Sequence, residues 1–291
     1  MKRLYLLLQY DGSLYSGSQV QRGSHCSTIQ GELWRAFEAL GIQFKIKRLH
    51  FASRTDKGVH ALGQVAELDV SPELLDTISD FALALNSVLP PSIAVQSVIT
   101  YQPSVLAERL PSVQFEAVAK WYRYRWLLSS QRSAFQRTNE VRCFQAFDIQ
   151  KAHAYAQGFL GEHDFRVFQS AGSSVTNTRC LLHYMGFSQQ FEEEIILDVV
   201  GNRFLYKMVR NMVAYLQQAG LNAEKALPPD AFLKQSVRPY SLRTAPSQGL
   251  TLMAIHYKQP FLQFNDVRVK ILSHAFNKEF SNVENLFSKT R

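Results

Sequence analysis

One short stretch holds the residue types that catalysis needs, and it reads Ser53-Arg54-Thr55-Asp56-Lys57-Gly58-Val59-His60-Ala61. Asp56 lies between Arg54 and Lys57, whose positive charges favour the ionised carboxylate. An ionised, oriented carboxylate can act as a nucleophile, a general base or a metal ligand. Gly58 permits a backbone turn beside it. No second carboxylate lies nearby in sequence, so a paired-acid mechanism is not visible. The plainer alternative is a turn with a local ion pair.

A second candidate is the expected strand Lys120–Leu128. Side chains alternate across a strand, so Tyr122 shares one face with Tyr124 and Trp126. An aromatic row can stack on unpaired bases, and arginines on the opposite face can meet phosphates. The alternative is that the aromatic face is core, with Tyr122 as the exception.

The third candidate is Arg210, in the segment Gly201–Met212. An apolar stripe predicts a core helix over 204–218, and Arg210 falls beside this stripe rather than opposite it. A partly buried arginine requires an acidic partner, and a catalytic carboxylate is one candidate.

Apolar periodicity and turn residues indicate the elements that must position these groups. A helix is expected from a capping box at Ser27 and Gln30 to a stop at Gly41. A second is expected from Pro72 to about Val88, and a third follows a cap at Asp148. Strands are expected over Leu4–Tyr10, Val65–Val70, Ile93–Ile99, Phe115–Leu128, Ile195–Val200 and Leu250–Tyr257.

These elements predict an α+β protein of two comparable halves. We place the first half, with the Asp56 loop, at residues 1–105 and the second at 106–260. Residues 261–291 form an amphipathic extension, read either as one or two docked helices or as a partner-binding tail.

Amino-acid composition further limits the classes of protein to which the chain can belong. The 291 residues include 46% hydrophobic and 19% charged residues, typical of a packed globular protein. The apolar runs are far shorter than the roughly 18 residues of a membrane span. The three cysteines have neither disulfide nor zinc spacing. We therefore expect a cytoplasmic protein. Its net charge of +8 favours phosphate-rich partners, although a solvated basic face is the alternative.

Taken in order, several motifs resemble the tRNA pseudouridine synthase A family over about residues 1–258. They are Tyr10-Asp11-Gly12 with Gly17 and Gln19, Thr28-Ile29-Gln30, Arg54-Thr55-Asp56 with Gly58-Val59-His60-Ala61, Gln64-Val65, Tyr122-Arg123-Tyr124, Gly161 with His163-Asp164-Phe165 and Phe168, Phe204 with Met208–Val213, and Ala245-Pro246 with Gly249-Leu250.

The resemblance implies two ferredoxin-like (RRM-like) halves with joined antiparallel sheets around a central basic cleft. It implies a homodimer that binds tRNA and converts uridine to pseudouridine in the anticodon arm, at tRNA positions 38, 39 and 40. No cofactor or metal is implied, in line with the absence of a nucleotide-binding fingerprint or metal-ligand motif.

The resemblance also implies a role for each matching residue. Asp56 is the catalytic carboxylate, as nucleophile or base, and Arg210 pairs with it. Tyr122 packs on the target uracil and helps to remove the C5 proton. Arg54 fills the space of the flipped base, and Leu250 lines the pocket.

Several residues depart from the family pattern: Ser18 stands where tryptophan is usual, and Lys207 where histidine is common. These departures keep three alternatives open. One is a paralogue that modifies another tRNA or RNA position. Another is a catalytically idle tRNA-binding or folding protein. The third is a small-molecule enzyme on the same fold.

Overall fold

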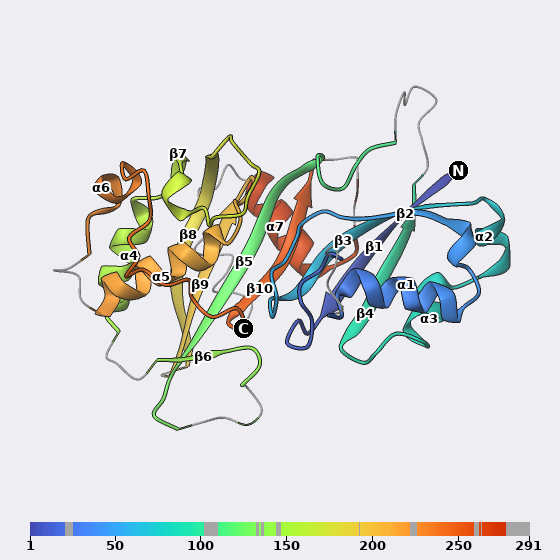
Figure 1. Cartoon of the computed structure of the whole chain (residues 1–291), viewed down its shortest axis with the longest axis horizontal. Helices are drawn as coiled ribbons and strands as arrows, with labels where there is room; N and C mark the ends of the chain where they lie inside the picture. The colour runs from blue at the N-terminus through green and yellow to red at the C-terminus, as the bar shows by residue number, and fades with distance from the viewer. Residues whose placement is uncertain are drawn as a thin grey trace. The chain divides into compact units, whose positions relative to one another are not determined.

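The computed structural model describes residues 1–20, 26–101, 110–131, 134, 137–143, 147–191, 193–221, 226–258, 262 and 264–277. They fall into two units, and Figure 1 labels the helices and strands of each. Met1–Val118 and Leu252–Ser273 form the first unit, and Ala119–Thr251 with the described residues from His274 onward form the second. The boundary expected near residue 105 and the end of the extension, 278–291, lie outside the described residues. Both units mix strands with helices, which confirms the α+β class.

Up to Thr100 the first unit follows the order β-α-β-β-α-β, with two short helices, α2 and α3, in the second helical position. Its elements are β1 (Lys2–Tyr10), α1 (Ile29–Ala39), the 3₁₀ helix η1 (Gln43–Lys45), β2 (Ile46–Phe51), β3 (His60–Val70), α2 (Glu73–Thr77), α3 (Phe81–Asn86), β4 (Ile93–Thr100) and, from Leu252, β10 (Leu250–Tyr257). The strand order is β4-β1-β3-β10, and β2 pairs with β3 as well. The pairs of β1 with β3, β1 with β4 and β2 with β3 are antiparallel.

β1 is buried along most of its length, on both faces of the sheet. Its run Leu4–Leu8 is at most 2% exposed, which explains why this strand reads as a continuous apolar stretch rather than an alternating one. On α1, Leu33 and Phe37 are completely buried and form part of the same core. The expected first strand is therefore confirmed.

The helix expected from Ser27 to Gly41 is confirmed, but its cap is one residue later. The Oγ1 atom of Thr28 accepts the N–H of Gly31 at 3.1 Å, as an N-cap does. The Ser27 hydroxyl instead donates to Glu32. Gly41 follows the helix with φ of +69°, the left-handed conformation of a glycine stop.

Two expected helices differ from the structure. The single helix over 72–88 is two short helices, because Ile78 is extended and Asp80 begins α3 by accepting the Leu83 N–H at 2.9 Å. The helix expected from Phe204 begins only at Met208. Lys207 has φ of +58°, so residues before Met208 do not continue the helix.

The second unit contains a separate run of elements. They are β5 (Ala117–Leu128), β6 (Val141–Cys143), α4 (Ile149–Gln157), β7 (Gly161–Asp164), the 3₁₀ helix η2 (Arg166–Phe168), β8 (Arg179–Phe191), β9 (Glu194–Gly201), α5 (Met208–Leu221) and α6 (Pro229–Leu233). Its strand order is β5-β9-β8-β7, all antiparallel, and β6 runs parallel to β5. In this unit α4 contacts both α5 and β8 (Figure 1). The expected cap of α4 is confirmed, since Asp148 accepts the Lys151 N–H at 3.0 Å.

Aromatic rings in tilted contact fill the core between the helices of the second unit. The ring centroids of Tyr215 and Phe232 lie 4.5 Å apart, and those of Phe168 and Phe232 lie 5.1 Å apart. Contacts of this kind stabilise a core beyond the area they bury. They fix α5, which carries Arg210, against α6 and η2.

The extension includes one described helix, α7 (Val267–Asn277). Among the helices that the structure describes, none combines the length and the apolar character that a membrane span requires.

Candidate functional site

Asp56 lies in the loop between β2 and β3 of the first unit. Its side chain is half-buried, and Arg54 in the same loop is exposed. The Val59 N–H donates to the carbonyl oxygen of Asp56 at 3.1 Å, and the Gly58 N–H donates to that of Tyr15 at 3.2 Å. Gly58 has φ of +76°, so the expected glycine turn beside Asp56 is confirmed.

Thr55, immediately before Asp56, is held through its backbone and its side chain. The Oγ atom of Ser18 accepts the Thr55 N–H at 2.9 Å, and the Ser18 N–H donates to the Thr55 carbonyl at 3.1 Å. The hydroxyls of Thr55 and Tyr10 share a hydrogen bond of 2.8 Å. Ser18 is completely buried, so water does not compete for these bonds. The position of the Asp56 backbone is therefore set by buried polar contacts.

Gln64, on β3, holds the other end of the loop. Its Nε2 atom donates to the Ser53 carbonyl at 2.7 Å and to the Tyr10 hydroxyl at 3.2 Å. Its Oε1 atom accepts the Ser53 N–H at 3.2 Å. Gln64 is completely buried, and a buried amide with its hydrogen bonds made defines one conformation of the surrounding backbone.

Gly17 allows Ser18 to approach the loop this closely. Its φ is +117°, and a Cβ atom built on it would lie 2.8 Å from the Thr55 carbonyl oxygen. Any other residue at position 17 would push the Asp56 loop away from Ser18.

In the second unit Tyr122 lies on β5, directly opposite Val199 of β9. Its side chain is 6% exposed, so it is nearly as buried as Tyr124 and Trp126 on the same face. The ring meets Phe204 edge to face, with centroids 5.2 Å apart. The expectation that Tyr122, unlike Tyr124 and Trp126, lies outside the core is therefore wrong. The Tyr122 side chain is buried, because Phe204 packs against it.

Arg210 lies in the first turn of α5 and is half-buried. Its Nε atom donates to the carbonyl oxygen of Ala245 at 2.8 Å, and the Ala245 N–H donates back to the Arg210 carbonyl at 3.3 Å. Burial raises the pKa of the Tyr124 hydroxyl, and the charge of Arg210 partly opposes that shift. The guanidinium is thus oriented by Ala245 and lies within electrostatic range of Tyr124.

Leu250 begins β10 directly after the segment that holds Arg210. It is 5% exposed, and its N–H donates to the Ser247 carbonyl at 2.9 Å. The Tyr124 hydroxyl donates to the Pro246 carbonyl at 3.0 Å. A Cβ atom on Gly249 would lie 2.7 Å from the ring of Tyr124, so only glycine allows this approach. Residues 245–250 therefore pack directly against β5.

The structure thus groups the sequence-predicted residues into two sets. Arg54 and Asp56 belong to the first unit, and Tyr122, Arg210 and Leu250 belong to the second. The resemblance gave no role to Tyr10 or Gln64, and Ser18 entered only as a departure from the family pattern. Gln64 did carry a signal, since it is a polar residue that directly precedes the expected strand Val65–Val70.

The arginines of β5 have different roles from the one expected. Arg123 is 7% exposed and forms two hydrogen bonds of 2.9 Å with the carboxylate of Asp198, which also accepts the Trp121 Nε1–H at 2.6 Å. Burial alone would lower the pKa of Arg123, but Asp198 outweighs it and raises that pKa. The Nε atom of Arg125 lies 3.5 Å from the Oε1 atom of Glu194, so the two side chains form an ion pair. The interpretation of Arg123 as a phosphate contact is wrong, because its guanidinium forms a buried ion pair within the sheet.

Metal ligands do not gather in the part of the chain that the structure describes, where no group of three or more histidine, cysteine or acidic side chains is placed to hold an ion. No disulfide joins the three cysteines, all of which the structure describes, and Cys143 and Cys180 are buried. Burial raises the pKa of Cys180 to about 11, so this thiol is protonated at neutral pH.

Sequence comparison identifies related proteins along nearly the whole chain. A family profile described as tRNA pseudouridine synthase matches residues 155–258. The tRNA pseudouridine synthase A of Limosilactobacillus fermentum is 34% identical over 268 residues, 91% of this chain and 100% of that protein. The protein of the same name from Maridesulfovibrio salexigens is 34% identical over 88% of this chain and 91% of its own length. That from Moorella thermoacetica is 36% identical over 88% of this chain and 100% of its own length.

Among solved structures, a Cbf5-Nop10-Gar1 complex aligns over 74% of this chain and 44% of that chain, at 11% identity and a TM-score of 0.34. A similarity this low does not define the fold. The family instead follows from the sequence relatives, which are matched over at least nine-tenths of their own length. This chain belongs to the tRNA pseudouridine synthase A family.

Proposed function

We propose that the protein isomerises uridine to pseudouridine in the anticodon arm of tRNA, at positions 38, 39 and 40, with Asp56 as the catalytic carboxylate. The coarser part of this statement follows from the family, whose members are tRNA pseudouridine synthases and therefore isomerases. The observation that carries the proposal is identity of 34% over 91% of the chain. A homodimer, a cytoplasmic location and independence from any cofactor belong to the same proposal.

The reaction exchanges one glycosidic bond for another. The bond between N1 of uracil and C1′ of ribose breaks, the base turns, and C5 bonds to C1′. A proton leaves C5 and a proton is taken up at N1, so no atoms are gained or lost. Asp56 serves either as the nucleophile at C1′ or as the base that removes a proton. In both roles the carboxylate must be ionised and fixed in position, and the contacts of Thr55 and Ser53 support the second requirement.

Arg210 is proposed as the ion-pair partner of Asp56, because it matches the family's arginine and because its guanidinium is already oriented. The bond from its Nε atom to Ala245 fixes the plane of the group. A planar guanidinium held along one edge can present its other donors to a carboxylate in a defined geometry. This arrangement would aim the Asp56 carboxylate during the reaction.

The other proposed roles concern the target base. A uridine must leave its stack to be reached, and unstacking costs a few kcal/mol. The exposed Arg54 is proposed to fill the vacated space. Tyr122, held by Phe204, is proposed to pack on the uracil, and the buried Leu250 to form an apolar wall of the pocket.

Two ferredoxin-like halves remain part of the proposal. In the first unit the β-α-β-β-α-β order, together with strands β4-β1-β3 and β2 paired to β3, supports this topology. The joined sheets and the basic cleft come from the resemblance alone.

The test is to incubate the purified protein with unmodified tRNA transcripts and to map pseudouridine at single-nucleotide resolution. Asp56→Asn should abolish modification and leave tRNA affinity unchanged, because the substitution removes a reactive group but no phosphate contact. Asp230→Asn is a matched control, since this carboxylate on α6 is exposed and lies 4.0 Å from the Nζ atom of Lys234 at the surface. Turnover by Asp56→Asn would refute the catalytic assignment. Tight, salt-dependent binding without modification by the wild-type protein would favour an idle tRNA-binding protein or another RNA substrate.

A further inference from the structure

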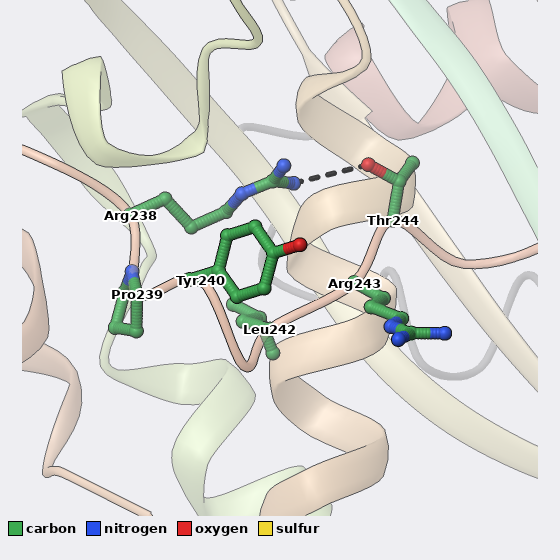
Figure 2. A pocket seen from close by; sticks show the side chains of 6 residues that line it. All are labelled: Arg238, Pro239, Tyr240, Leu242, Arg243 and Thr244. Atoms are coloured by element: carbon green, nitrogen blue, oxygen red, sulfur yellow. Dashed lines mark hydrogen bonds between the residues drawn. The ribbon is translucent and has the colours of Figure 1, made fainter.

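A pocket of about 390 Å³ lies in the second unit, in the segment that leads from α6 to β10. It is shown in Figure 2, and its lining residues are Arg238, Pro239, Tyr240, Leu242, Arg243 and Thr244. In that view the ring of Tyr240 lies between the side chains of Arg238 and Arg243. No role follows for this pocket from the proposed chemistry at Asp56.

The inner wall of the pocket is held by hydrogen bonds to α5. The Nη1 atom of Arg238 donates to the Thr244 hydroxyl at 3.1 Å and also to Oδ1 of Asn211. The Thr244 hydroxyl donates to the same Asn211 oxygen at 2.7 Å, and Asn211 is completely buried. The wall is therefore preorganised, which lowers the entropic cost of binding a ligand there.

The outer wall is unusual for a folded protein. Tyr240 is 99% exposed, so a large aromatic ring stands almost entirely in water. Arg243 beside it is exposed as well. Exposed aromatic and arginine side chains on one surface are typical of sites that bind single-stranded nucleic acid, where a ring stacks on a base and a guanidinium meets the phosphate.

The lining of the pocket also adjoins, along the chain, residues of the proposed active site in this unit. Thr244 directly precedes Ala245, whose carbonyl oxygen accepts the bond from Arg210. Asn211, which holds the inner wall, directly follows Arg210 on α5. A ligand in the pocket would therefore lie one residue from the groups that orient Arg210.

We propose that this pocket binds an unpaired nucleotide of the tRNA substrate other than the target uridine. Tyr240 stacks on its base, and Arg243, with the charge of Arg238 behind it, faces its phosphate. The inference rests on the proposed function, since it presumes that tRNA is the substrate. Stacking on a ring is tolerant of base identity, so the pocket adds affinity and registration rather than sequence selection.

The test measures tRNA affinity and modification separately. The dissociation constant of an unmodified tRNA transcript is determined over a series of salt concentrations, and single-turnover pseudouridine formation is followed at saturating protein. The variants are Tyr240→Ala, Tyr240→Phe and Arg243→Gln. Phe191→Ala is the matched control, because this ring at the end of β8 is also exposed, at 73%. Thermal melting confirms that each variant is folded.

Tyr240→Ala should raise the dissociation constant about 10-fold and leave the saturating rate near that of wild type. Tyr240→Phe keeps the stacking face and should bind like wild type. Arg243→Gln should weaken binding and reduce the slope of log affinity against log salt by about one, as expected for one lost phosphate contact. Phe191→Ala should change neither quantity.

Wild-type affinity for Tyr240→Ala would overturn the inference, as would a lower saturating rate with affinity retained. An unchanged slope of log affinity against log salt for Arg243→Gln would show that Arg243 makes no phosphate contact, which would contradict the proposed role of this residue. These failures are distinguishable from failure of the proposed function. If only the pocket inference fails, the wild-type protein still modifies tRNA and that modification still depends on Asp56. If the proposed function fails, the wild-type protein does not modify tRNA through Asp56.

Discussion

Two regions carry the proposed catalytic residues, and they are held in different ways. The Asp56 loop, residues 52–59 of the first unit, is fixed by buried polar side chains, in which Ser18 and Gln64 bind its backbone. The Arg210 region comprises Arg210, residues 245–250 and the face of β5 that carries Lys120, Tyr122 and Tyr124, all in the second unit, and it is fixed largely by close backbone and ring packing. There Gly249 lies against the ring of Tyr124.

The difference predicts which kind of substitution damages each region. A loop held by buried hydrogen bonds is sensitive to the deletion of a single polar atom, because the partner is then left unsatisfied away from water. A region held by close packing is sensitive to added volume, because neighbouring atoms have nowhere to move. Variants that reverse this pattern would show that the comparison is wrong.

The largest effect is expected for Gly249→Ala in the Arg210 region. The added Cβ would lie 2.7 Å from Cζ of Tyr124 and 3.1 Å from the carbonyl oxygen of Arg125. Tyr124 is completely buried and bonded to Pro246, so its ring has no room to turn. We expect a loss of about 2–3 kcal/mol in the free energy of unfolding, measured by denaturant titration.

A double-mutant cycle identifies the cause of that loss. In a Tyr124→Ala background the added methyl group has space, so Gly249→Ala should destabilise the protein much less than it does in the wild type. An equal loss in both backgrounds would mean that the ring of Tyr124 is not what excludes a side chain at position 249.

Ser18→Ala should have the next largest effect, in the Asp56 loop. It removes the acceptor of the Thr55 N–H, and because Ser18 is completely buried no water takes its place. We expect a loss of roughly 1–3 kcal/mol of stability. Since Thr55 adjoins Asp56, kcat for pseudouridine formation should fall while KM for tRNA stays near the wild-type value. A change confined to KM would contradict this positioning role.

Tyr124→Phe provides the matched deletion in the Arg210 region. It also removes one hydroxyl, which donates to the Pro246 carbonyl at 3.0 Å. Pro246 is exposed, so water can satisfy that carbonyl after the change. We expect a loss below about 1 kcal/mol, measured in the same denaturant titration. A loss as large as that of Ser18→Ala would remove the proposed difference between the two regions.

The sequence predicted those parts of the fold that depend on local patterns. The strand Leu250–Tyr257 and the cap at Asp148 are confirmed, because an apolar strand and an N-cap are each encoded within a few residues. β8 was missed, since its run to Phe191 contains Gly186 and three consecutive polar residues from Ser188. The helix expected from Phe204 starts late because the left-handed Lys207 has no sequence signal of the kind that glycine provides.

The residues of the candidate site also fall into those that local sequence patterns predict and those that they do not. Asp56 could be singled out because its charged neighbours and Gly58 are adjacent in sequence. The role of Ser18 could not be predicted, because its partner Thr55 is 37 positions away and only the fold brings the two together. The same holds for Arg123, whose partner Asp198 is 75 positions distant. Contacts of this length are set by strand pairing and turn geometry rather than by local pattern.

The smallest expected effect is a dependence of stability on pH, and it should again differ between the two regions. Lys120 on β5 lies two residues before Tyr122, and burial, followed by the charge of Arg203, lowers its pKa to about 8. The contacts that Ser18 and Gln64 make to the Asp56 loop involve uncharged groups that do not titrate in this range. Between pH 8 and 10.5 the unfolded chain holds the Lys120 proton and the folded chain does not, so stability rises with pH in that window.

Lys120→Met removes this contribution. The stability of the wild type relative to Lys120→Met should therefore be lowest below pH 8, rise from pH 8 to 10.5, and level off above. Other groups titrate in both proteins, so the difference between their denaturation midpoints isolates Lys120. A difference that is flat across this range would mean that Lys120 keeps its ordinary pKa in the folded protein, and the Arg210 region would then be no more sensitive to alkaline pH than the Asp56 loop.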